Sequence, residues 1–241
     1  NSVFLIDGGD ISGSRYDKIR LTPFGETMPY VSAWPWLEKK LLSIGAAGMT
    51  FDLARGDELR ADGFWIETPD ETLSRPGIKW YRGVKLVTPI CFEVTETALC
   101  RRLVTNAAKD GAAVILVNVT NDGWFGDWDA GRMQHALAAR WRSIELGVSM
   151  VRAANTGISG VEWFGFSDGY KPLRIEGRSS RVEGVLVADV PVVSEATFYR
   201  KVGDLCWVFP LTLVGLVILA IVRRTPNNQV DGSGTETAKA A

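Results

Sequence analysis

Histidine and cysteine are scarce in this chain of 241 residues, and their scarcity excludes several kinds of site. His135 is the single histidine, so a histidine-rich metal site is excluded and any Ser/His/Asp triad would have to use it. The three cysteines, Cys91, Cys100 and Cys206, include no CxxC pair and are too few for a disulfide framework. Neither zinc nor disulfide bonds therefore organise the fold.

An excess of charge of either sign is also missing. The chain has 27 Lys and Arg against 28 Asp and Glu, which gives a net charge of −1. This balance is not typical of a nucleic-acid-binding protein, and 46% hydrophobic residues exclude a disordered chain. The length suits one domain of moderate size with some chain to spare.

The chain begins at Asn1 in a strand-like run, without an initiator Met or a signal peptide. We expect it to be incomplete at its N-terminus.

Hydrophobic periodicity predicts an α/β layered domain, because strand-like and helix-like segments alternate along the chain. The stretch Gly83–Cys91 reads as a central strand, and Thr95 is a plausible N-cap for the helix that follows. The apolar run 112–119 is typical of a strand buried on both faces. The other expected elements are strands 3–6, 64–66, 148–153, 159–164 and 182–190, helices 96–109 and 131–146, and turns 7–10 and 165–169.

Two stretches indicate contact with a membrane. Tyr30–Leu42 is a short amphipathic pattern with Trp34 and Trp36, either a surface helix packed on the core or an arm that touches lipid. Leu205–Val222 carries no charge and has about the ~20 residues that span a bilayer, although a buried core helix has the same pattern. Arg223 and Arg224 would then face the cytoplasm, with the polar tail 223–241 behind them.

Cys91 ends an apolar strand, and Glu93 follows two residues later. A thiol at the carboxyl end of a strand is where open α/β sheets place their chemistry. A free cysteine is also commonly a small buried hydrophobe, so the strand alone leaves both interpretations open.

Three groups of segments stand out by their order and spacing. They are Tyr16-Asp-Lys18 with Pro23-Phe-Gly-Glu26; Ile90-Cys-Phe-Glu93; and Asn121-Asp-Gly-Trp-Phe-Gly126 with Gln134-His135 and Arg152-Ala-Ala-Asn-Thr-Gly157. Together with the Arg140–Leu146 helix segment, they resemble the nitrilase superfamily, and its apolipoprotein N-acyltransferase branch in particular. The resemblance runs from Asn1 to about Val222.

The resemblance implies a four-layer α-β-β-α sandwich over residues 1–200, a transmembrane helix at 205–222 and a cytoplasmic tail at 223–241. It also implies a Glu-Lys-Cys catalytic set in which Cys91 matches the nucleophile, Lys18 matches the lysine and Glu26 matches a further carboxylate. The general-base Glu of the family would lie upstream of Asn1 and has no counterpart here, and neither has the family's N-terminal bundle of membrane helices.

The same resemblance assigns further residues to the pocket: Phe92, Glu93, Asn121, Trp124 and Phe125. Phe92 departs from the branch, which commonly carries Tyr after the nucleophile, so a hydroxyl is missing there. We interpret His135 as a structural residue, since a lone histidine on a helix is more often a satisfied hydrogen-bonding group than a base.

Acyl transfer through a cysteine needs a thiolate, a proton acceptor and donors for an oxyanion. An ammonium beside a thiol favours the thiolate, so Lys18 would activate Cys91 and also bind the oxyanion together with the Phe92 N–H. Glu26 would orient Lys18 and keep it charged. The family's upstream Glu would move the proton, and its loss would cost orders of magnitude in rate.

The reaction implied by the resemblance moves an acyl chain from a phospholipid to the cysteine and then to the N-terminal amine of a lipidated cysteine on an apolipoprotein. It needs no cofactor or metal. The resemblance places the enzyme in the bacterial inner membrane with its catalytic domain on the periplasmic side. A membrane-anchored nitrilase-type amidase and a non-catalytic fragment remain as alternatives.

Overall fold

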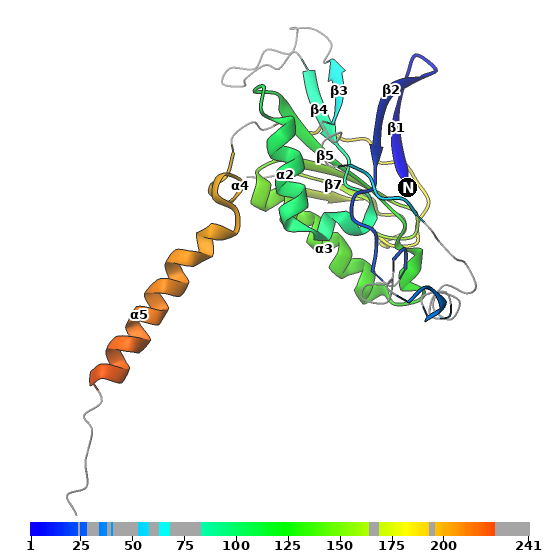
Figure 1. The fold of residues 1–241 in the computed structure, drawn as a ribbon. Helices are drawn as coiled ribbons and strands as arrows, with labels where there is room; N and C mark the ends of the chain where they lie inside the picture. Colours follow the sequence, from blue (N-terminus) through cyan, green and yellow to red (C-terminus); the bar gives the residue numbers. More distant parts are fainter. Residues whose placement is uncertain are drawn as a thin grey trace, which may run out of the picture. The chain divides into compact units, whose positions relative to one another are not determined.

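The computed structural model describes residues 1–23, 25–27, 34–37, 40, 53–57, 63–67, 83–163, 169–192 and 196–224. The chain forms two compact units, Asn1–Gly203 and Asp204–Ala241. The first unit is a mixed α/β domain (Figure 1), and the second contains a long apolar helix.

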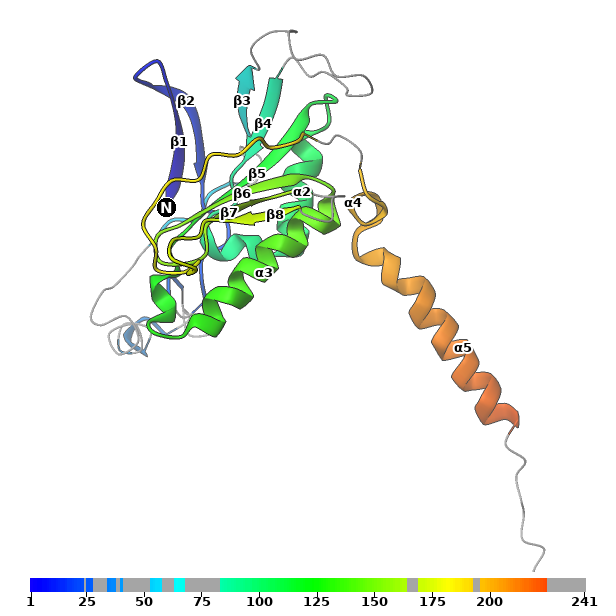
Figure 2. The same cartoon turned by 180° about the vertical axis from the view of Figure 1, so that it is seen from behind.

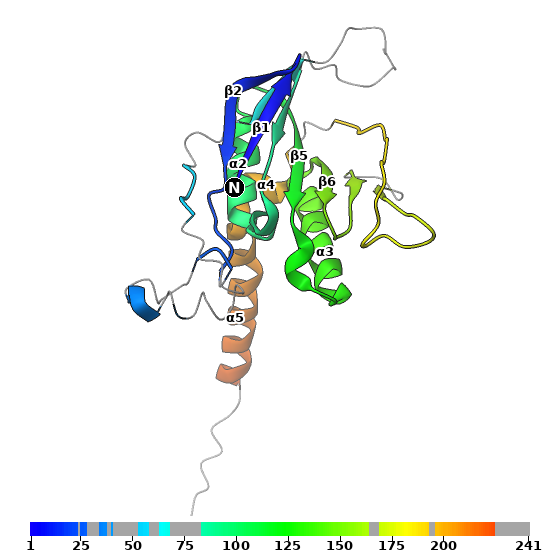
Figure 3. The same ribbon diagram turned by 90° about the vertical axis from the view of Figure 1, so that its right-hand side faces the viewer.

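The first unit contains a hairpin and a larger mixed sheet. Strands β1 (Ser2–Asp7) and β2 (Asp10–Asp17) pair antiparallel and form the hairpin (Figure 3). The larger sheet has the strand order β3-β4-β5-β6-β7-β8. Its strands are β3 (Phe64–Glu67), β4 (Gly83–Val87), β5 (Ala113–Thr120), β6 (Ser149–Ala154), β7 (Gly160–Glu162) and β8 (Tyr170–Pro172).

The three strands β4, β5 and β6 run parallel, and the outer pairings are antiparallel. Helix α2 (Thr97–Ala107) connects β4 to β5, and α3 (Asp129–Leu146) connects β5 to β6. Successive right-handed crossovers in the same direction place both helices on one face of the sheet. Accordingly, α2 and α3 contact each other. Figure 1 shows α2 in front of the sheet, and Figure 2 shows it behind the sheet.

The core lies between this face of the sheet and α2. Val114 and Leu116 of β5 pack in one cluster with Leu99, Leu103 and Val104 of α2. The alternate β5 residues Ile115, Val117 and Val119 are only half-buried. The strand was expected to be buried on both faces, but only the face toward α2 is fully buried.

Helix α3 presents its more polar side to the protein. Its apolar side is exposed and carries Met133, Leu137, Trp141 and Ile144. The buried side carries Gly131, Arg132, His135, Ala139, Arg142, Ser143 and Leu146. Gly147 ends the helix in the left-handed conformation at φ 65°, as the Gly in this position predicts.

Two local predictions are wrong. Residues 182–190 form no strand, because no ladder pairs them with another described strand, and Val185 and Val187 are exposed. Thr95 does not cap α2, because its hydroxyl donates to the Phe92 carbonyl at 2.8 Å in the short 3-10 helix η3 (Cys91–Thr95). Glu96 takes the N-cap position without a side-chain hydrogen bond.

Other expectations fall on residues that the structure does not describe. Of the predicted amphipathic segment 30–42, residues 35–37 are helical, and Trp34 and Trp36 are exposed. The predicted turn at 165–169 lies outside the described residues apart from Gly169, as does the tail after Arg224.

Most of the candidate membrane helix belongs to the second unit, and its first residues, Phe198–Gly203, belong to the first. Within the described residues, one helical stretch, Phe198–Arg223, is long and apolar enough to cross a membrane. It is composed of α4 (Phe198–Val202), the 3-10 helix η5 (Gly203–Trp207) and α5 (Val208–Arg224). Length and composition alone make it a candidate span.

Leu103→Ala should lower the free energy of unfolding by about 2–5 kcal/mol, because Leu103 is 1% exposed and its loss leaves a cavity under α2. Leu137→Ala on α3 is the matched control, since Leu137 is 48% exposed. Thermal unfolding of the detergent-solubilised protein measures both. Equal midpoints for the two variants would contradict the placement of the core.

Candidate active site

The carboxyl ends of the parallel strands bring three distant segments to one edge of the sheet. The 3-10 helix η3 follows β4, the 3-10 helix η4 (Asp122–Phe125) follows β5, and Asn155 follows β6. Open α/β sheets bind their ligands outside this edge. All three of the segments that the sequence singled out after residue 83 meet here.

Cys91 occupies a sharp turn at this edge. Its φ is +51°, a left-handed conformation that costs a non-glycine residue about 1–3 kcal/mol. The thiol is half-buried, and Sγ donates a weak hydrogen bond to the Asn121 carbonyl at 3.8 Å. The next backbone N–H, that of Phe92, has no acceptor among the described residues. A thiol and an unused N–H therefore stand side by side.

Cys100 has the opposite environment. It is 0% exposed, its Sγ donates to the Glu93 carbonyl at 3.3 Å, and burial raises the pKa of its thiol to about 12. A thiol in such a place stays protonated and inert. Of these two cysteines, only Cys91 is placed for chemistry.

Lys18 and Glu26 form a direct ion pair. Lys18 comes immediately after β2, is 1% exposed, and places Nζ 2.6 Å from Glu26 Oε2 and 3.1 Å from Thr22 Oγ1. The Thr22 N–H donates to the same carboxylate oxygen at 2.7 Å. Burial opposes the charge on Glu26, but the hydrogen bonds from Lys18 and Thr22 hold the pKa of Glu26 below its ordinary value.

Glu93 is the most heavily hydrogen-bonded carboxylate of this edge. The backbone N–H groups of Ile19 and Arg20 donate to Oε1 at 2.6 and 2.8 Å. The Ile90 N–H and the Tyr16 hydroxyl donate to Oε2 at 2.7 and 2.9 Å. The side chain is 0% exposed, and burial raises the pKa of Glu93 against the effect of these four donors.

These contacts tie the two halves of the candidate site together. Glu93 lies two residues after Cys91, and two of its donors belong to the residues directly after Lys18. No hydrogen bond or ion pair joins Lys18 to Cys91 within the described residues. Glu93 thus holds the segment of Lys18 against the turn of Cys91 without itself reaching the surface.

A second buried network lies beneath the Cys91 turn. Asp122 is 0% exposed and receives Arg152 Nη2 at 2.9 Å on one oxygen. Its other oxygen lies 2.8 Å from His135 Nδ1 and 3.0 Å from the Thr120 hydroxyl. Burial opposes the charge, but the hydrogen bond from His135 and the charge of Arg152 hold the pKa of Asp122 below its ordinary value.

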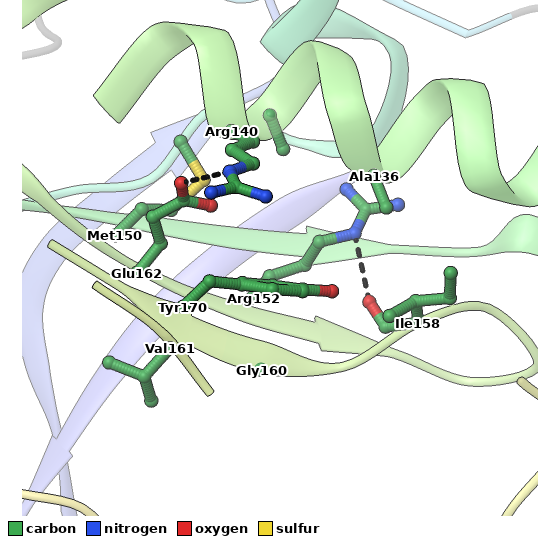
Figure 4. Close-up of a pocket in the computed structure, with 10 residues that line it drawn as sticks. Ala136, Arg140, Met150, Arg152, Ile158, Gly160, Val161, Glu162 and Tyr170 are labelled. Atoms are coloured by element: carbon green, nitrogen blue, oxygen red, sulfur yellow. Dashed lines mark hydrogen bonds and ion pairs between the residues drawn. The ribbon is translucent and has the colours of Figure 1, made fainter. Parts of the chain in front are cut away.

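Arg152 extends this network to the turn. It donates from Nη1 to the side chain of Asn118. Its Nε donates to the Ile158 carbonyl at 3.1 Å, the contact marked by a dashed line in Figure 4. Asn118 Nδ2 in turn donates to the Pro89 carbonyl at 2.8 Å and to the Cys91 carbonyl at 3.5 Å. Burial lowers the pKa of Arg152, against the nearby charge of Asp122.

The loop after β5 is fixed to the loop after β6. Asn155 Nδ2 donates to Asn121 Oδ1 at 2.7 Å, and Asn155 Oδ1 accepts the Asp122 N–H at 3.0 Å. Gly157 leaves room for this arrangement, because a Cβ there would lie 1.8 Å from Asp122 Oδ2. The Asn-Asp and Asn-Thr-Gly segments are therefore parts of one structure.

Aromatic side chains cover the same edge. Trp124 is 50% exposed and lies over Gly25, where a Cβ would be 3.5 Å from its ring. Phe125 packs its ring 6.3 Å from that of Trp128 and 5.9 Å from that of His135. Trp124 thereby reaches the loop that carries Glu26.

A separate cavity of about 190 Å³ lies on α3 and β8. It is lined by Arg140, Tyr170, Arg174 and Ser179 together with apolar side chains. In the adjoining hollow, Arg140 Nε contacts Glu162 at 2.9 Å (Figure 4). Its guanidinium also lies 5.1 Å from the Tyr170 ring, and burial raises the pKa of Glu162 to about 7. Arg140 is on α3, Glu162 ends β7 and Tyr170 begins β8. Within the described residues, no hydrogen bond or ion pair joins these three side chains to Cys91.

Four residues that hold the site from below were not predicted. Tyr16, Asn118, Asp122 and Arg152 received no role, although three of them lie in the quoted motifs. A buried strand that carries Asn118 amid apolar neighbours was the available signal. Among the described residues, no cluster of three His, Cys, Asp or Glu side chains could hold a metal ion.

Glu93→Gln should destabilise the protein by about 1–3 kcal/mol, because an amide NH2 would face backbone N–H donors that then lose their acceptor. Glu96→Gln is the matched control, since the Glu96 side chain makes no capping hydrogen bond. Urea unfolding monitored by tryptophan fluorescence measures the difference. A Glu93→Gln variant as stable as Glu96→Gln would show that the carboxylate is not needed.

Asp122→Asn should cost about 3–5 kcal/mol at pH 7, because it leaves Arg152 and His135 without their anion. The folded-state pKa of Asp122 lies below its ordinary 3.8, so its stabilisation is present above about pH 4 and is lost as the pH falls through the folded-state pKa. The variant should lack this acid-dependent loss. Asp127→Asn, at a fully exposed side chain, is the control and should follow the wild-type melting curve from pH 3 to 7.

The comparisons with known proteins agree with the resemblance. No protein-family model matches the chain. The chain is 34% identical over 226 residues to the apolipoprotein N-acyltransferase of Bradyrhizobium diazoefficiens. This alignment covers 93% of this chain and 35% of that protein. The enzymes of that name from Chlorobaculum tepidum and Geobacter metallireducens are 35% and 32% identical and cover 87% and 95% of the chain.

The match to the last two relatives likewise takes in 34% and 37% of their length. The chain thus spans about a third of the curated relatives it matches. The aligned part includes the residues that build the edge around Cys91, since it covers nearly the whole chain. By sequence, the chain belongs to the apolipoprotein N-acyltransferase family.

Proposed function

We propose that this chain carries the acyl-transfer centre of a membrane acyltransferase, which moves a fatty acyl chain from a phospholipid to the N-terminal amine of a lipoprotein through a thioester on Cys91. The observation that supports it best is the Cys91 turn, fixed by Glu93 to the segment of the Lys18–Glu26 ion pair. The relatives named apolipoprotein N-acyltransferase supply the reaction class.

In the first half-reaction, the Cys91 thiolate attacks the ester carbonyl carbon of the phospholipid. The tetrahedral oxyanion takes hydrogen bonds from the Phe92 N–H and from Lys18. The C–O bond then breaks, and the lysophospholipid leaves after its alkoxide takes up a proton. Glu26 keeps Lys18 charged and in place, as their 2.6 Å contact supports.

In the second half-reaction, the α-amine of the lipidated N-terminal cysteine attacks the thioester carbonyl. The C–S bond breaks, the amine loses a proton, and the thiolate of Cys91 returns. In each cycle the lysophospholipid alkoxide takes up one proton and the amine gives up one, and a general-base carboxylate carries that proton between the two half-reactions. No cofactor or metal takes part.

We propose that the domain has the nitrilase-like four-layer α-β-β-α sandwich fold. The half-buried face of β5, carrying Ile115, Val117 and Val119, is the surface on which a second sheet would stack. The helices α2 and α3 would form one outer layer. Residues 1–200 would form this catalytic domain, with the pocket shaped by Phe92, Asn121, Trp124 and Phe125.

The apolar helix fits substrates that stay in a membrane. Residues 205–222 would span the bacterial inner membrane, and the Arg pair at 223–224 would keep the tail 223–241 cytoplasmic. The catalytic domain would then face the periplasm. Exposed Trp34, Trp36 and Trp124 suit the interfacial region from which a phospholipid would enter.

Cys91→Ala in the full gene product should abolish transfer of a labelled acyl chain from phospholipid to a lipidated N-terminal cysteine peptide, because the proposed thioester forms on the Cys91 thiol. Cys100→Ala is the control and should keep transfer, since Cys100 is buried and inert. Thin-layer detection of labelled peptide measures both. Transfer by Cys91→Ala at the wild-type rate contradicts the proposal, and release of the label as free fatty acid only would indicate a hydrolase.

A further inference from the structure

His135 lies directly beneath the nucleophile turn, with its ring between two oxygen atoms. It is on α3, is 7% exposed, and places Nδ1 2.8 Å from Asp122 Oδ1. Its other nitrogen, Nε2, lies 3.3 Å from the carbonyl oxygen of Cys91. A carbonyl oxygen can only accept, so Nε2 is the donor to the Cys91 backbone.

The surroundings of the ring fix its orientation. Asp122 of η4 holds Nδ1, and Arg152 of β6, whose Nη2 is 3.2 Å from Nδ1, binds the other oxygen of Asp122. Phe125 packs against the ring face at 5.9 Å between centroids. The charged groups that reach the ring from η4 and β6 are therefore Asp122 and its partner Arg152, and Nε2 is directed at the Cys91 carbonyl of η3, which also packs on α3.

That place matters because a peptide group is planar. The carbonyl of Cys91 and the N–H of Phe92 belong to the same peptide plane and point in opposite directions. Holding the carbonyl oxygen therefore sets the direction of the Phe92 N–H. This N–H has no acceptor among the described residues, and φ of Cys91 is +51°, so the turn needs support from outside.

We propose that His135 is a positioning residue for the oxyanion donor: oriented by Asp122, it holds the Cys91 carbonyl and so aims the Phe92 N–H at the oxygen of the acyl group. This inference rests on the proposed function, in which Cys91 is the nucleophile. Asn118 Nδ2, 3.5 Å from the same carbonyl, gives weaker support from the β5 side. In this proposal the Asn121–Gly126 loop, through Asp122, and His135 of the Gln134-His135 pair both hold the Cys91 carbonyl in place.

Two amide substitutions separate the two contacts of the ring. In His135→Gln the terminal amide lies near the position of Nε2, so the contact to Cys91 is kept and that to Asp122 is lost. In His135→Asn the amide lies near Nδ1, so the contact to Asp122 is kept and that to Cys91 is lost. A merely structural histidine would tolerate Asn better, because it preserves the partner of a buried carboxylate.

The experiment measures acyl-enzyme formation from a labelled phospholipid in the full gene product, together with thermal midpoints. His135→Asn should lower the acylation rate constant about 100-fold at nearly unchanged KM, as loss of an oxyanion donor does. His135→Gln should stay within about 10-fold of wild type even if its midpoint is the lower of the two. Alkylation of Cys91 by iodoacetamide, which forms no oxyanion, should be alike in both variants.

The inference is overturned if His135→Asn acylates as fast as His135→Gln, or if acylation and alkylation fall together in step with the thermal midpoint. Cys91→Ala, measured in parallel, keeps the two proposals apart. Acyl-enzyme formation by Cys91→Ala would refute the proposed function. A dead Cys91→Ala with a fully active His135→Asn would refute the role of His135 alone.

Discussion

The buried carboxylate of Glu93 is the interaction on which the candidate site depends. A carboxylate removed from water is costly unless its oxygens are satisfied, and four donors from three parts of the chain satisfy this one. Two of these parts are the segment after Lys18 and the approach to Cys91. Because the carboxylate needs all its donors at once, it fixes the end of the β1–β2 hairpin relative to the segment that follows β4.

A second constraint explains why motifs far apart in the sequence occur together. Asp122 from the loop after β5 is the common partner of His135 on α3 and Arg152 on β6, and Gly157 leaves space for its carboxylate. Asp122, His135 and Arg152 are all buried, so the loss of one would leave the polar groups of the other two without a partner. The two networks meet at η3: Glu93 holds one side of the Cys91 turn, and the network of Asp122 and Asn118 holds the other.

Periodicity predicted the parts of the fold that local sequence determines. The helices α2 and α3 and the strand β5 have strong patterns and clear ends, such as Gly147. The strand expected at Gly83–Cys91 ends earlier, at Val87, and Cys91 begins the 3-10 helix η3. The prediction of a strand at 182–190 is wrong, because an apolar run forms a strand only where a neighbouring strand offers backbone hydrogen-bond partners. Thr95 was expected to cap α2, but its hydroxyl bonds within η3 instead.

Motifs indicated the chemistry of Cys91, Lys18 and Glu26, but sequence could not reveal what holds them. Glu93 looked like a pocket residue, and only the fold shows its donors, which lie 73 to 77 positions away for three of the four. The same holds for Asn118 and Arg152, which are 34 positions apart. Such long-range hydrogen bonds have no periodic signature.

The most direct test of this account is peptide mass spectrometry of the full gene product after one turnover with phospholipid and no acceptor. We expect one acyl group on Cys91, removable by hydroxylamine as a thioester is, with an equal amount of lysophospholipid released. No adduct, or an adduct on Cys206 or on a hydroxyl group, would contradict the claim that this turn presents the nucleophile.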